Sequence, residues 1–377
     1  MAGYFSIGET KIRPGAYFNV ASAGDENSFG AVDGIVAVVF RSNMGPLMEV
    51  NTIDVTEGYE QVYGDGGTTD ALREAAFGGA RTLVAIRIGS GGTAAAAELT
   101  AATGKLKVTA KSVGAAGYTV TVRNSLTDAD KKEIIFFNGT TQLEKYEFAA
   151  GGDEVAAAIA ATANSTRFLL TAESSGAGAV TNVSQSALTG GADPTVTNAD
   201  YSNAFLELEK HYFNTICVDT NDASVHTLLA AFLERIYLTG SFGIGVVAQA
   251  HSVALATRET AAAAFNSEKM AFPLNAYVEA GDLELDGYQV AAYYAGLIAS
   301  TPSNESITHK VLGRYTNLKE LLTNSQIEAA EQSGCLVLST SAAGISGLIM
   351  ETRLLSARTR TMTAVGRRSA EPKPVMR

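Results

Sequence analysis

The chain has 377 residues, 46% of them hydrophobic and 18% charged, and its formal net charge is -11. This length exceeds what one hydrophobic core usually serves and predicts two or three domains, and the apolar share excludes a disordered chain. The acidic charge argues against a general nucleic-acid binder, because neutralising phosphates needs concentrated Lys and Arg.

Three further features narrow the class of protein. No apolar run approaches the roughly 18 to 20 residues that cross a bilayer, so we predict no membrane insertion. The first ten residues lack a basic region followed by an apolar stretch, so no secretory signal is expected. Cys217 and Cys335 each lie in an apolar stretch, which predicts buried, reduced thiols and a cytoplasmic protein.

The first elements predict an arm followed by a βαβ-like start. In residues 11–20 a proline and a glycine interrupt an otherwise strand-like stretch, which suits an edge strand or an arm. The apolar run 34–40 predicts a strand that is covered on both faces. Residues 70–79 predict a short helix ended by paired glycines, and residues 82–88 predict a second strand.

The composition changes at Gly89, after which Ala, Gly, Thr and Ser dominate to about Gly191. Apolar residues inside this stretch alternate with a period of two over several short runs, which predicts β-strands. Asn138 and Gly139 match a hairpin turn that requires positive φ at both central residues. One helix is expected over about 153–163. The stretch therefore predicts an all-β, sandwich-like domain.

From Thr197 onward the hydrophobic period becomes that of a helix. Thr197 is a candidate N-cap with Asp200 as its partner. The expected apolar face of this helix comprises Tyr201, Phe205, Leu208 and Tyr212. Strands and helices then alternate, which predicts a mostly parallel sheet flanked by helices. The predicted strands are 215–218, 243–248 and 274–278, and the predicted helices are 224–237, 254–265 and 288–300.

The fold class expected from this order is α/β. Residues 34–89 and 196–343 are predicted to form one discontinuous α/β core domain with a mostly parallel or mixed sheet. Residues 90–195 form an all-β domain inserted into it, an arrangement that costs little at an exposed loop. Residues 1–33 are an N-terminal arm, and residues 344–377 are a basic C-terminal tail.

Two glycine-rich stretches are candidates for phosphate-binding loops. Residues 64–67 lack the Lys-Ser/Thr pair of a P-loop, so a turn before the predicted helix at 70–79 is favoured. Residues 89–92 lead into an alanine run without a following acidic ribose contact, and a flexible domain linker explains them better. We therefore expect no cofactor.

The histidines do not form a metal-binding or catalytic pattern. His251 follows a predicted strand end and is the strongest catalytic candidate, although a surface or capping role is favoured. The spacing of the histidines contains no paired ligand arrangement, so no metal site is predicted. They are His211, His226, His251 and His309.

The other candidate residues also favour structural interpretations. Asp282, Glu284 and Asp286 alternate along an extended piece that suits a hard cation, a solvated strand face or a basic neighbour, and the last two are favoured. No G-x-S-x-G elbow occurs, and Cys217 lies within a predicted strand, where core packing is expected. Residues 353–377 hold six Arg and one Lys and are expected to be a disordered tail, not a nucleic-acid contact. We predict no enzyme.

Several stretches occur in an order and spacing that one family shares. The family-like stretches are 13–19 (RPGAYFN), 34–39 (GIVAVV), 188–193 (LTGGAD) with Asp200 and Tyr201, 295–302 (AGLIASTP), 306–310 (SITHK), 321–324 (LLTN) and 334–338 (GCLVL). Together they span about 13–338, and 295–302 is the most specific. In these stretches the chain resembles the phage tail sheath protein, the subunit of a contractile tail.

This resemblance implies a structural subunit whose α/β domain packs on the tail tube while the inserted β domain faces outward. Neighbouring copies would exchange terminal strands, which lets rigid bodies rotate without separating. An interface that repeats without closing generates a helix. Contraction would then be a rigid-body rearrangement that drives the tube through the target envelope. The implied inter-subunit arm strand comprises Ile12, Arg13, Pro14, Gly15, Ala16, Tyr17, Phe18, Asn19 and Val20.

The partners that the resemblance implies are neighbouring sheath subunits, the tail tube protein, and baseplate and tail terminator proteins. Direct nucleic-acid contact and membrane insertion are not expected. The protein would assemble in the host cytoplasm and belong to the virion tail or to a phage-tail-like particle.

Two alternatives belong to other functional classes. A glycan-binding or adhesive surface protein could present loops of the Ala/Gly/Thr-rich β domain to sugars, but the chain has no Trp and no visible export signal. An enzyme on the α/β core needs a pocket with converging titratable groups, and the sequence offers none.

Beyond about Ala343 the chain departs from the family pattern. Residues 344–350 (GISGLIM) stand where a Gly-Ile-Asn-Thr-Leu-like turn and a further segment are expected. We expect a truncated or diverged C-terminus that lacks one half of the strand exchange, whether through a frameshift, natural truncation or design. Weak polymerisation is then predicted, and sedimentation of the purified protein checks it. Long contractile sheaths formed by this chain alone would contradict it.

Overall fold

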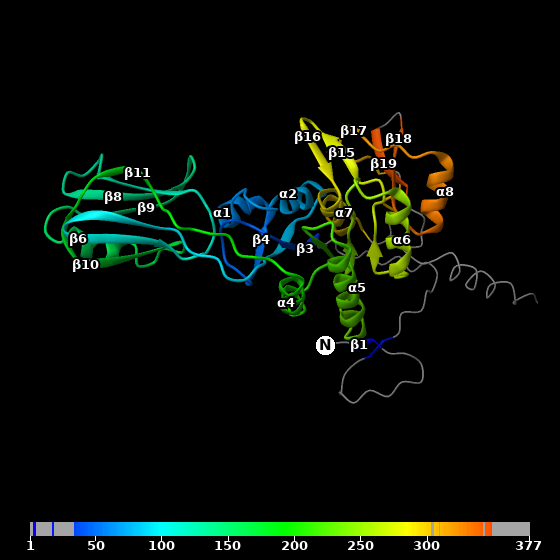
Figure 1. Cartoon of the computed structure of the whole chain (residues 1–377), viewed down its shortest axis with the longest axis horizontal. Coiled ribbons are helices and arrows are strands. Elements are labelled where there is room, and N and C mark those ends of the chain that lie inside the picture. Colours follow the sequence, from blue (N-terminus) through cyan, green and yellow to red (C-terminus); the bar gives the residue numbers. More distant parts are fainter. Residues whose placement is uncertain are drawn as a thin grey trace, which may run out of the picture.

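The computed structural model describes residues 3–4, 17–18, 34–302, 305–308, 310–341 and 344–348. In this part of the chain, two groups of elements lie toward opposite ends of an elongated molecule (Figure 1). An α/β group contains a six-stranded sheet with helices on both faces. A β-rich group built from residues 96–187 lies beyond one edge of it.

The six-stranded sheet is almost entirely parallel. Its strands in spatial order are β14 (Met270–Ala271), β13 (Ile244–Val246), β12 (Thr215–Val218), β3 (Ile35–Phe40), β5 (Thr82–Arg87) and β4 (Val50–Asp54). Only β4 and β5 pair antiparallel. Residues 36–40 of β3 are fully buried, as a central parallel strand covered on both faces requires. The predicted α/β class with a mixed sheet is confirmed.

Helices cover both faces of this sheet. On one face, α2 (Asp70–Phe77) and α7 (Tyr288–Ser300) pack against Val36, Val38 and Phe40. The opposite face is covered by α4 (Asn198–Leu208), α5 (Ala223–Leu238) and α6 (Leu255–Phe265). The other helices of this group are η1 (Val55–Glu57), α1 (Glu60–Tyr63) and α8 (Asn324–Gln332). Alternate residues of β3 therefore pack into two hydrophobic cores, one on each face of the sheet.

The β-rich group forms two sheets around a core of its own. Its elements are β6 (Ala96–Ala110), β7 (Tyr118–Asn124), β8 (Lys131–Asn138), β9 (Thr141–Ala149), α3 (Glu154–Ala161), β10 (Phe168–Val180) and β11 (Val183–Ala187). One sheet pairs β10 with β6, and the other has the order β11-β7-β8-β9. Phe136 and Phe168 stack at 4.2 Å in the core, which fits a sandwich-like packing.

The junction between the two groups is packed and hydrogen-bonded. The two connecting chain segments form antiparallel pairs at Ser90–Thr195, Thr93–Ala192 and Ala96–Thr189. Met44, from the loop after β3, is 1% exposed within the core of the β-rich group. The buried Arg87 donates to Ser42 O at 2.8 Å and to Gly45 O at 2.7 Å, which fixes that loop. The expected domain boundaries stay a prediction, and this arrangement supports them.

Smaller sheets complete the α/β group and the N-terminal segment. Three strands, β15 (Tyr277–Ala280), β16 (Leu283–Asp286) and β17 (Asn317–Leu318), form a sheet of order β16-β15-β17. Two further strands, β18 (Val337–Ser341) and β19 (Gly344–Leu348), form an antiparallel hairpin. At the N-terminus, β1 (Gly3–Tyr4) pairs parallel with β2 (Tyr17–Phe18).

Several predicted elements are confirmed with close bounds. The strand at 215–218 and the helix at 288–300 have the predicted ends. Thr197 and Asp200 form the predicted reciprocal cap of α4, with Thr197 N donating to Asp200 Oδ2 at 2.7 Å. The apolar face of α4 is shorter than expected, because the helix ends at Leu208. Tyr212 lies beyond that end and is 61% exposed.

Three local predictions were wrong. The strand predicted at 274–278 is β15, which is antiparallel and belongs to the separate sheet, while β14 takes the expected place in the parallel sheet. The βαβ-like start missed β4, an antiparallel edge strand. In the β8–β9 hairpin, Asn138 pairs with Thr141, so Gly139 begins the turn and is its only residue with positive φ, at 57°.

Close approach of α2 and α7 depends on two glycines. A Cβ on Gly296 would lie 2.1 Å from Ala75 O, and a Cβ on Gly78 would lie 2.1 Å from Tyr293 O. Backbone carbonyls cannot yield as a flexible side chain could. Gly296 belongs to the AGLIASTP stretch, so the most specific family-like stretch coincides with a contact between helices.

We predict that Gly296→Ala lowers the free energy of unfolding by about 2 kcal/mol or more, because a methyl group in this contact overpacks the core. Urea denaturation followed by circular dichroism measures the change. Gly313→Ala is the matched control, since no atom lies within 4 Å of its Cβ position. Equal stability of the two variants would contradict the close-contact explanation.

Candidate functional site

The carboxyl ends of β3 and β12 bring together a cluster of polar side chains. Arg41 follows β3 and Asp219 follows β12. The Asp219 side chain is fully buried and accepts from Arg41 N at 2.9 Å, Arg41 Nε at 2.7 Å and Tyr201 OH at 2.5 Å. Thr68 Oγ1 is a further donor to it. The cluster therefore joins two strands, the loop before α2 and helix α4.

Burial and the contacts with Asp219 determine the pKa values of the neighbouring groups. Burial acts against the Arg41 guanidinium, but the charge and hydrogen bond of Asp219 outweigh it and raise the pKa of Arg41. Burial and the nearby Asp219 charge raise the pKa of Tyr201. Its hydroxyl is consequently a neutral donor at physiological pH. A buried carboxylate held by several donors is a structural link that tolerates little displacement.

This cluster lies at the topological switch point of the sheet. The chain continues from β3 to β5 on one side and reaches β12 on the other. Open α/β sheets often bind ligands at such a point. A pocket of about 310 Å³ is present, lined by Arg41, Ser42, Gly67, Thr68, Ile88, Asp193 and Pro194. Arg41 and Thr68 are already bonded to Asp219, and the chain returning from the β-rich group supplies part of the wall. The return segment thus lies beside the cluster and lines the same pocket.

The glycine-rich stretches have local structural explanations. Residues 64–67 form a turn between α1 and α2, as predicted. A Cβ on Gly67 would lie 2.6 Å from Arg41 O, and φ at Gly67 is 73°. Residues 89–92 lie in the paired connecting segments, so they do not form a free linker. The expectation of a flexible linker there was wrong, because Ser90 bonds with Thr195 in both directions.

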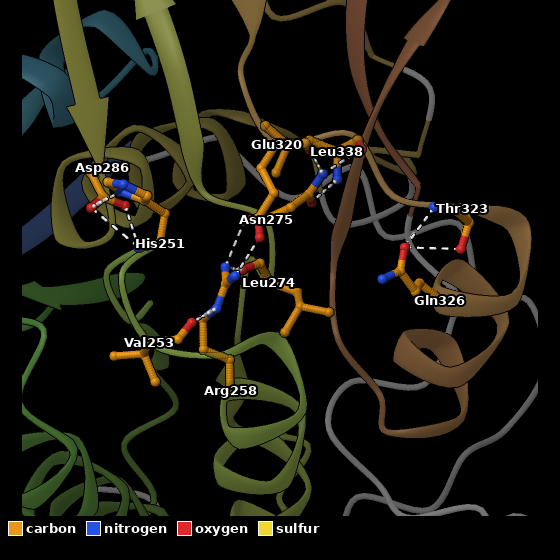
Figure 2. A network of polar contacts seen from close by, with 10 residues as sticks. All are labelled: His251, Val253, Arg258, Leu274, Asn275, Asp286, Glu320, Thr323, Gln326 and Leu338. Carbon is orange, nitrogen blue, oxygen red and sulfur yellow. Dashed lines mark hydrogen bonds and ion pairs between the residues drawn. The ribbon is translucent and has the colours of Figure 1, made fainter.

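The predicted histidine candidates are not brought together. His226 is buried with Nε2 2.9 Å from Thr220 O, and burial lowers its pKa. His251 stacks on Tyr277 at 3.9 Å. Its Nδ1 lies 2.8 Å from Asp286 Oδ2 (Figure 2). His211 is exposed just after α4. His309 lies outside the described residues.

The alternating acidic residues follow the favoured interpretation of a contact with basic neighbours. Glu284 lies 3.2 Å from Lys319 Nζ and accepts from Tyr277 OH at 2.8 Å. Asp286 binds His251, as above. Within the described ranges, no group of three or more His, Cys, Asp or Glu side chains is placed to hold a metal ion.

Both cysteines are buried and free. Burial raises the pKa of Cys217 and raises that of Cys335 to about 12. Both therefore carry protonated thiols at physiological pH and pack as small apolar residues.

A second buried ionic link escaped the sequence analysis. Arg258 of α6 is 1% exposed and binds Glu320, with Nη1 2.8 Å from Glu320 Oε2 (Figure 2). It also donates to Val253 O at 2.9 Å and to Leu274 O at 2.6 Å. Arg258 stands between Thr257 and the charged Glu259, which makes it look like a surface residue in the sequence, and no local signal identifies it as buried.

The predicted arm strand falls mostly outside the described residues. Of residues 12–20, the structure describes only Tyr17 and Phe18, which form β2. The tail at 344–377 is described only over residues 344–348. Both functional assignments stay predictions. In the part of the chain that is described, no helix has the length and apolarity needed to span a membrane.

Comparison with known proteins assigns the central part of the chain to a family. Residues 195–346 match the phage tail sheath protein central domain. The sheath tail protein of Desulfitobacterium hafniense is 24% identical, with a TM-score of 0.67 over 88% of this chain and 74% of that one. The sheath tail protein of Listeria innocua is 24% identical, with a TM-score of 0.65 over 85% of this chain and 68% of that one.

A curated relative has no stated function. The uncharacterized protein YqbK of Bacillus subtilis (strain 168) is 27% identical over 254 residues, which cover 62% of this chain and 52% of that protein. The chain thus spans about half the length of this relative.

The described α/β architecture is the fold of tail sheath proteins. Residues 195–346 match the phage tail sheath protein central domain, and the predicted resemblance to the phage tail sheath family is confirmed. This segment includes Tyr201, Asp219, Arg258 and Glu320, so both buried ionic links involve the matched domain.

We predict that Asp219→Ala lowers the free energy of unfolding by about 2–3 kcal/mol, because it leaves the buried Tyr201 hydroxyl and the half-exposed Arg41 guanidinium without their acceptor. Chemical denaturation gives the value. Tyr201→Phe should cost less, about 1–2 kcal/mol, since it removes one hydrogen bond to a charged group. Glu98→Gln, in an exposed ion pair with Lys105, is the control and should change little. An Asp219→Ala protein as stable as this control would refute the link.

Proposed function

We propose that this chain is a structural subunit of a contractile tail sheath, with no enzymatic role of its own. In this proposal the subunits polymerise helically around a tail tube and rearrange as rigid bodies to drive the tube through a target envelope. The match of residues 195–346 to the phage tail sheath central domain is the observation that carries it. The sheath-like fold over most of the chain supports it.

Internal rigidity supports a mechanism in which whole subunits move. Asp219 fixes α4 to the central strands, and Arg258 fixes α6 to the segment that holds Glu320. The buried Glu74 of α2 accepts from Arg314 Nη2 at 2.9 Å, which ties α2 to a third region. Breaking any of these links would leave a buried charge without its partner, which costs about 3–5 kcal/mol. Motion within a subunit is therefore costly, which favours its movement as one body.

The domain division follows the same proposal. Residues 34–89 and 196–343 are the inner domain that lies against the tube, and residues 90–195 are the outer domain. Separate cores in the two groups support this division. Residues 1–33 serve as the N-terminal arm, and residues 344–377 are the diverged basic tail.

Neighbouring copies are linked through the arm strand at residues 12–20. Backbone hydrogen bonds of an added strand join rigid bodies while allowing them to pivot. The strand conformation of Tyr17 and Phe18 supports this use of the segment. A neighbouring copy, the tail tube, the baseplate and the tail terminator are the proposed partners. The particle is a virion tail or a phage-tail-like bacteriocin, assembled in the host cytoplasm. The glycan-binding alternative gains nothing from the family match.

We predict that Phe18→Pro weakens self-association, because proline removes a backbone donor that a shared strand needs. Sedimentation velocity over a range of concentrations measures association, and negative-stain electron microscopy shows whether the assemblies are helical. Phe18→Tyr is the matched control, since it keeps the backbone donor and the aromatic ring. Equal association of both variants would contradict strand exchange through residues 12–20, and sugar binding without self-association would favour the adhesive alternative.

A further inference from the structure

The β18–β19 hairpin continues the central sheet beyond β14. After β14 the chain runs beside the start of β18, and Pro273 forms a parallel bridge with Leu336. Leu336 N donates to Phe272 O at 2.9 Å, and Leu274 N donates to Leu336 O at 2.9 Å. Backbone hydrogen bonds therefore join the hairpin to the chain that follows β14 at Leu336, the residue just before β18.

One side chain extends this ladder by a further step. The chain leaves the edge of β18 toward β15, but the fully buried Asn275 remains beside Leu338. Leu338 N donates to Asn275 Oδ1 at 2.8 Å, and Asn275 Nδ2 donates to Leu338 O at 2.9 Å (Figure 2). A carboxamide offers one acceptor and donors in the same plane, as a peptide group does. Asn275 thus takes the place of a strand residue.

The orientation of this amide is fixed by the Arg258–Glu320 link. Asn275 Nδ2 also donates to Glu320 O at 3.0 Å. Arg258 Nη1 donates to Leu274 O, immediately before Asn275, and to the Glu320 carboxylate. Figure 2 shows Arg258 rising from α6 between these two groups. Helix α6 therefore sets the position of the residue before Asn275 and of the carbonyl that its amide binds.

The hairpin has a backbone contact on its other side as well. Leu312 N donates to Ile345 O of β19 at 2.8 Å. This contact comes from the segment before β17, which belongs to the three-stranded sheet. The hairpin is thus bonded on one side to the central sheet and on the other to a loop of the smaller sheet. Asn275 is the side-chain member of the first attachment.

We infer that Asn275 is a positioning residue that joins the β18–β19 hairpin to the central sheet, with Arg258 and Glu320 holding its amide in place. The functional consequence rests on the proposed sheath function. A hairpin near the end of the sheath central domain can pass a displacement between neighbouring copies and the body of the subunit only if it is attached rigidly. Asn275 supplies that attachment where the backbone turns away.

Hydrogen exchange of the unassembled protein tests the joint directly. We expect Asn275→Asp to raise exchange of the backbone amides in 336–341 roughly tenfold to a hundredfold, because the isosteric carboxylate cannot donate to Leu338 O and Glu320 O. Exchange in 215–218, within β12, should stay as in the wild type. Asn317→Ala, which removes an exposed amide bonded to Glu279 Oε2, is the control and should leave both segments unchanged.

The isosteric variant separates hydrogen bonding from space filling. A residue that merely fills space would leave exchange in 336–341 unchanged in Asn275→Asp, and this result would overturn the inference. An equal rise in 336–341 and 215–218 would also overturn it, since Asn275 would then support the whole core. Should Asn275→Asp fail to fold, Glu320→Gln weakens the Arg258 link and should give a smaller rise confined to 336–341. Unchanged exchange there would count against the joint.

Assembly gives a separate measurement. If the sheath proposal holds, Asn275→Asp should reduce self-association in sedimentation while the Asn317→Ala protein associates like the wild type. If the wild-type chain associates too weakly for this comparison, as its diverged C-terminus predicts, the exchange data still decide whether Asn275 joins the hairpin to the sheet.

Discussion

The Asp219 carboxylate accepts hydrogen bonds from Arg41, Thr68 and Tyr201, which come from segments that lie on both sides of the β-rich insertion in the sequence. Removing such a group from water is costly, and only complete bonding offsets the cost. The carboxylate therefore fixes the register between β3, β12 and α4 together. Helix α4, which begins directly after the returning chain, is tied to the central strands by this one group, while the returning chain itself pairs with the outgoing segment.

The other buried ionic links repeat this principle further from the centre. Arg258 binds the chain that follows the edge strand β14, and Glu74 ties helix α2 to Arg314. Each joins segments between which backbone pairing is absent or ends. Apolar burial gives the two cores most of their cohesion, whereas these directional contacts select one arrangement of elements. A subunit that moves as one body needs both properties.

The sequence predicted those parts of the fold that carry a periodic pattern over many residues. The helix at 288–300 and the apolar strand at 215–218 are such cases. In contrast, β14 has two residues, too few for any pattern, so the strand was placed at 274–278 instead. The antiparallel edge strand β4 was missed because its alternation is weak and it precedes two short helices.

The polar links were less accessible to sequence analysis than the elements. Asp219 follows an apolar strand, where a functional group could have been expected, but Arg41 is 178 residues away in the chain. Nothing local connects the two. Arg258 has the surroundings of a surface helix residue, and Asn275 lies in a short irregular segment. Such contacts are set by the packing of distant elements and follow from the fold.

The paired segments at Ser90–Thr195 bring the two ends of the β-rich insertion side by side. The insertion therefore leaves and re-enters the α/β group at one place, as a loop does, and its length does not change that geometry. Another domain could replace the β-rich group if its two ends lay as close together as two bridged β-strands. Its core would also have to accept the Met44 side chain. The β-rich group is therefore free to diversify while the α/β group stays constant.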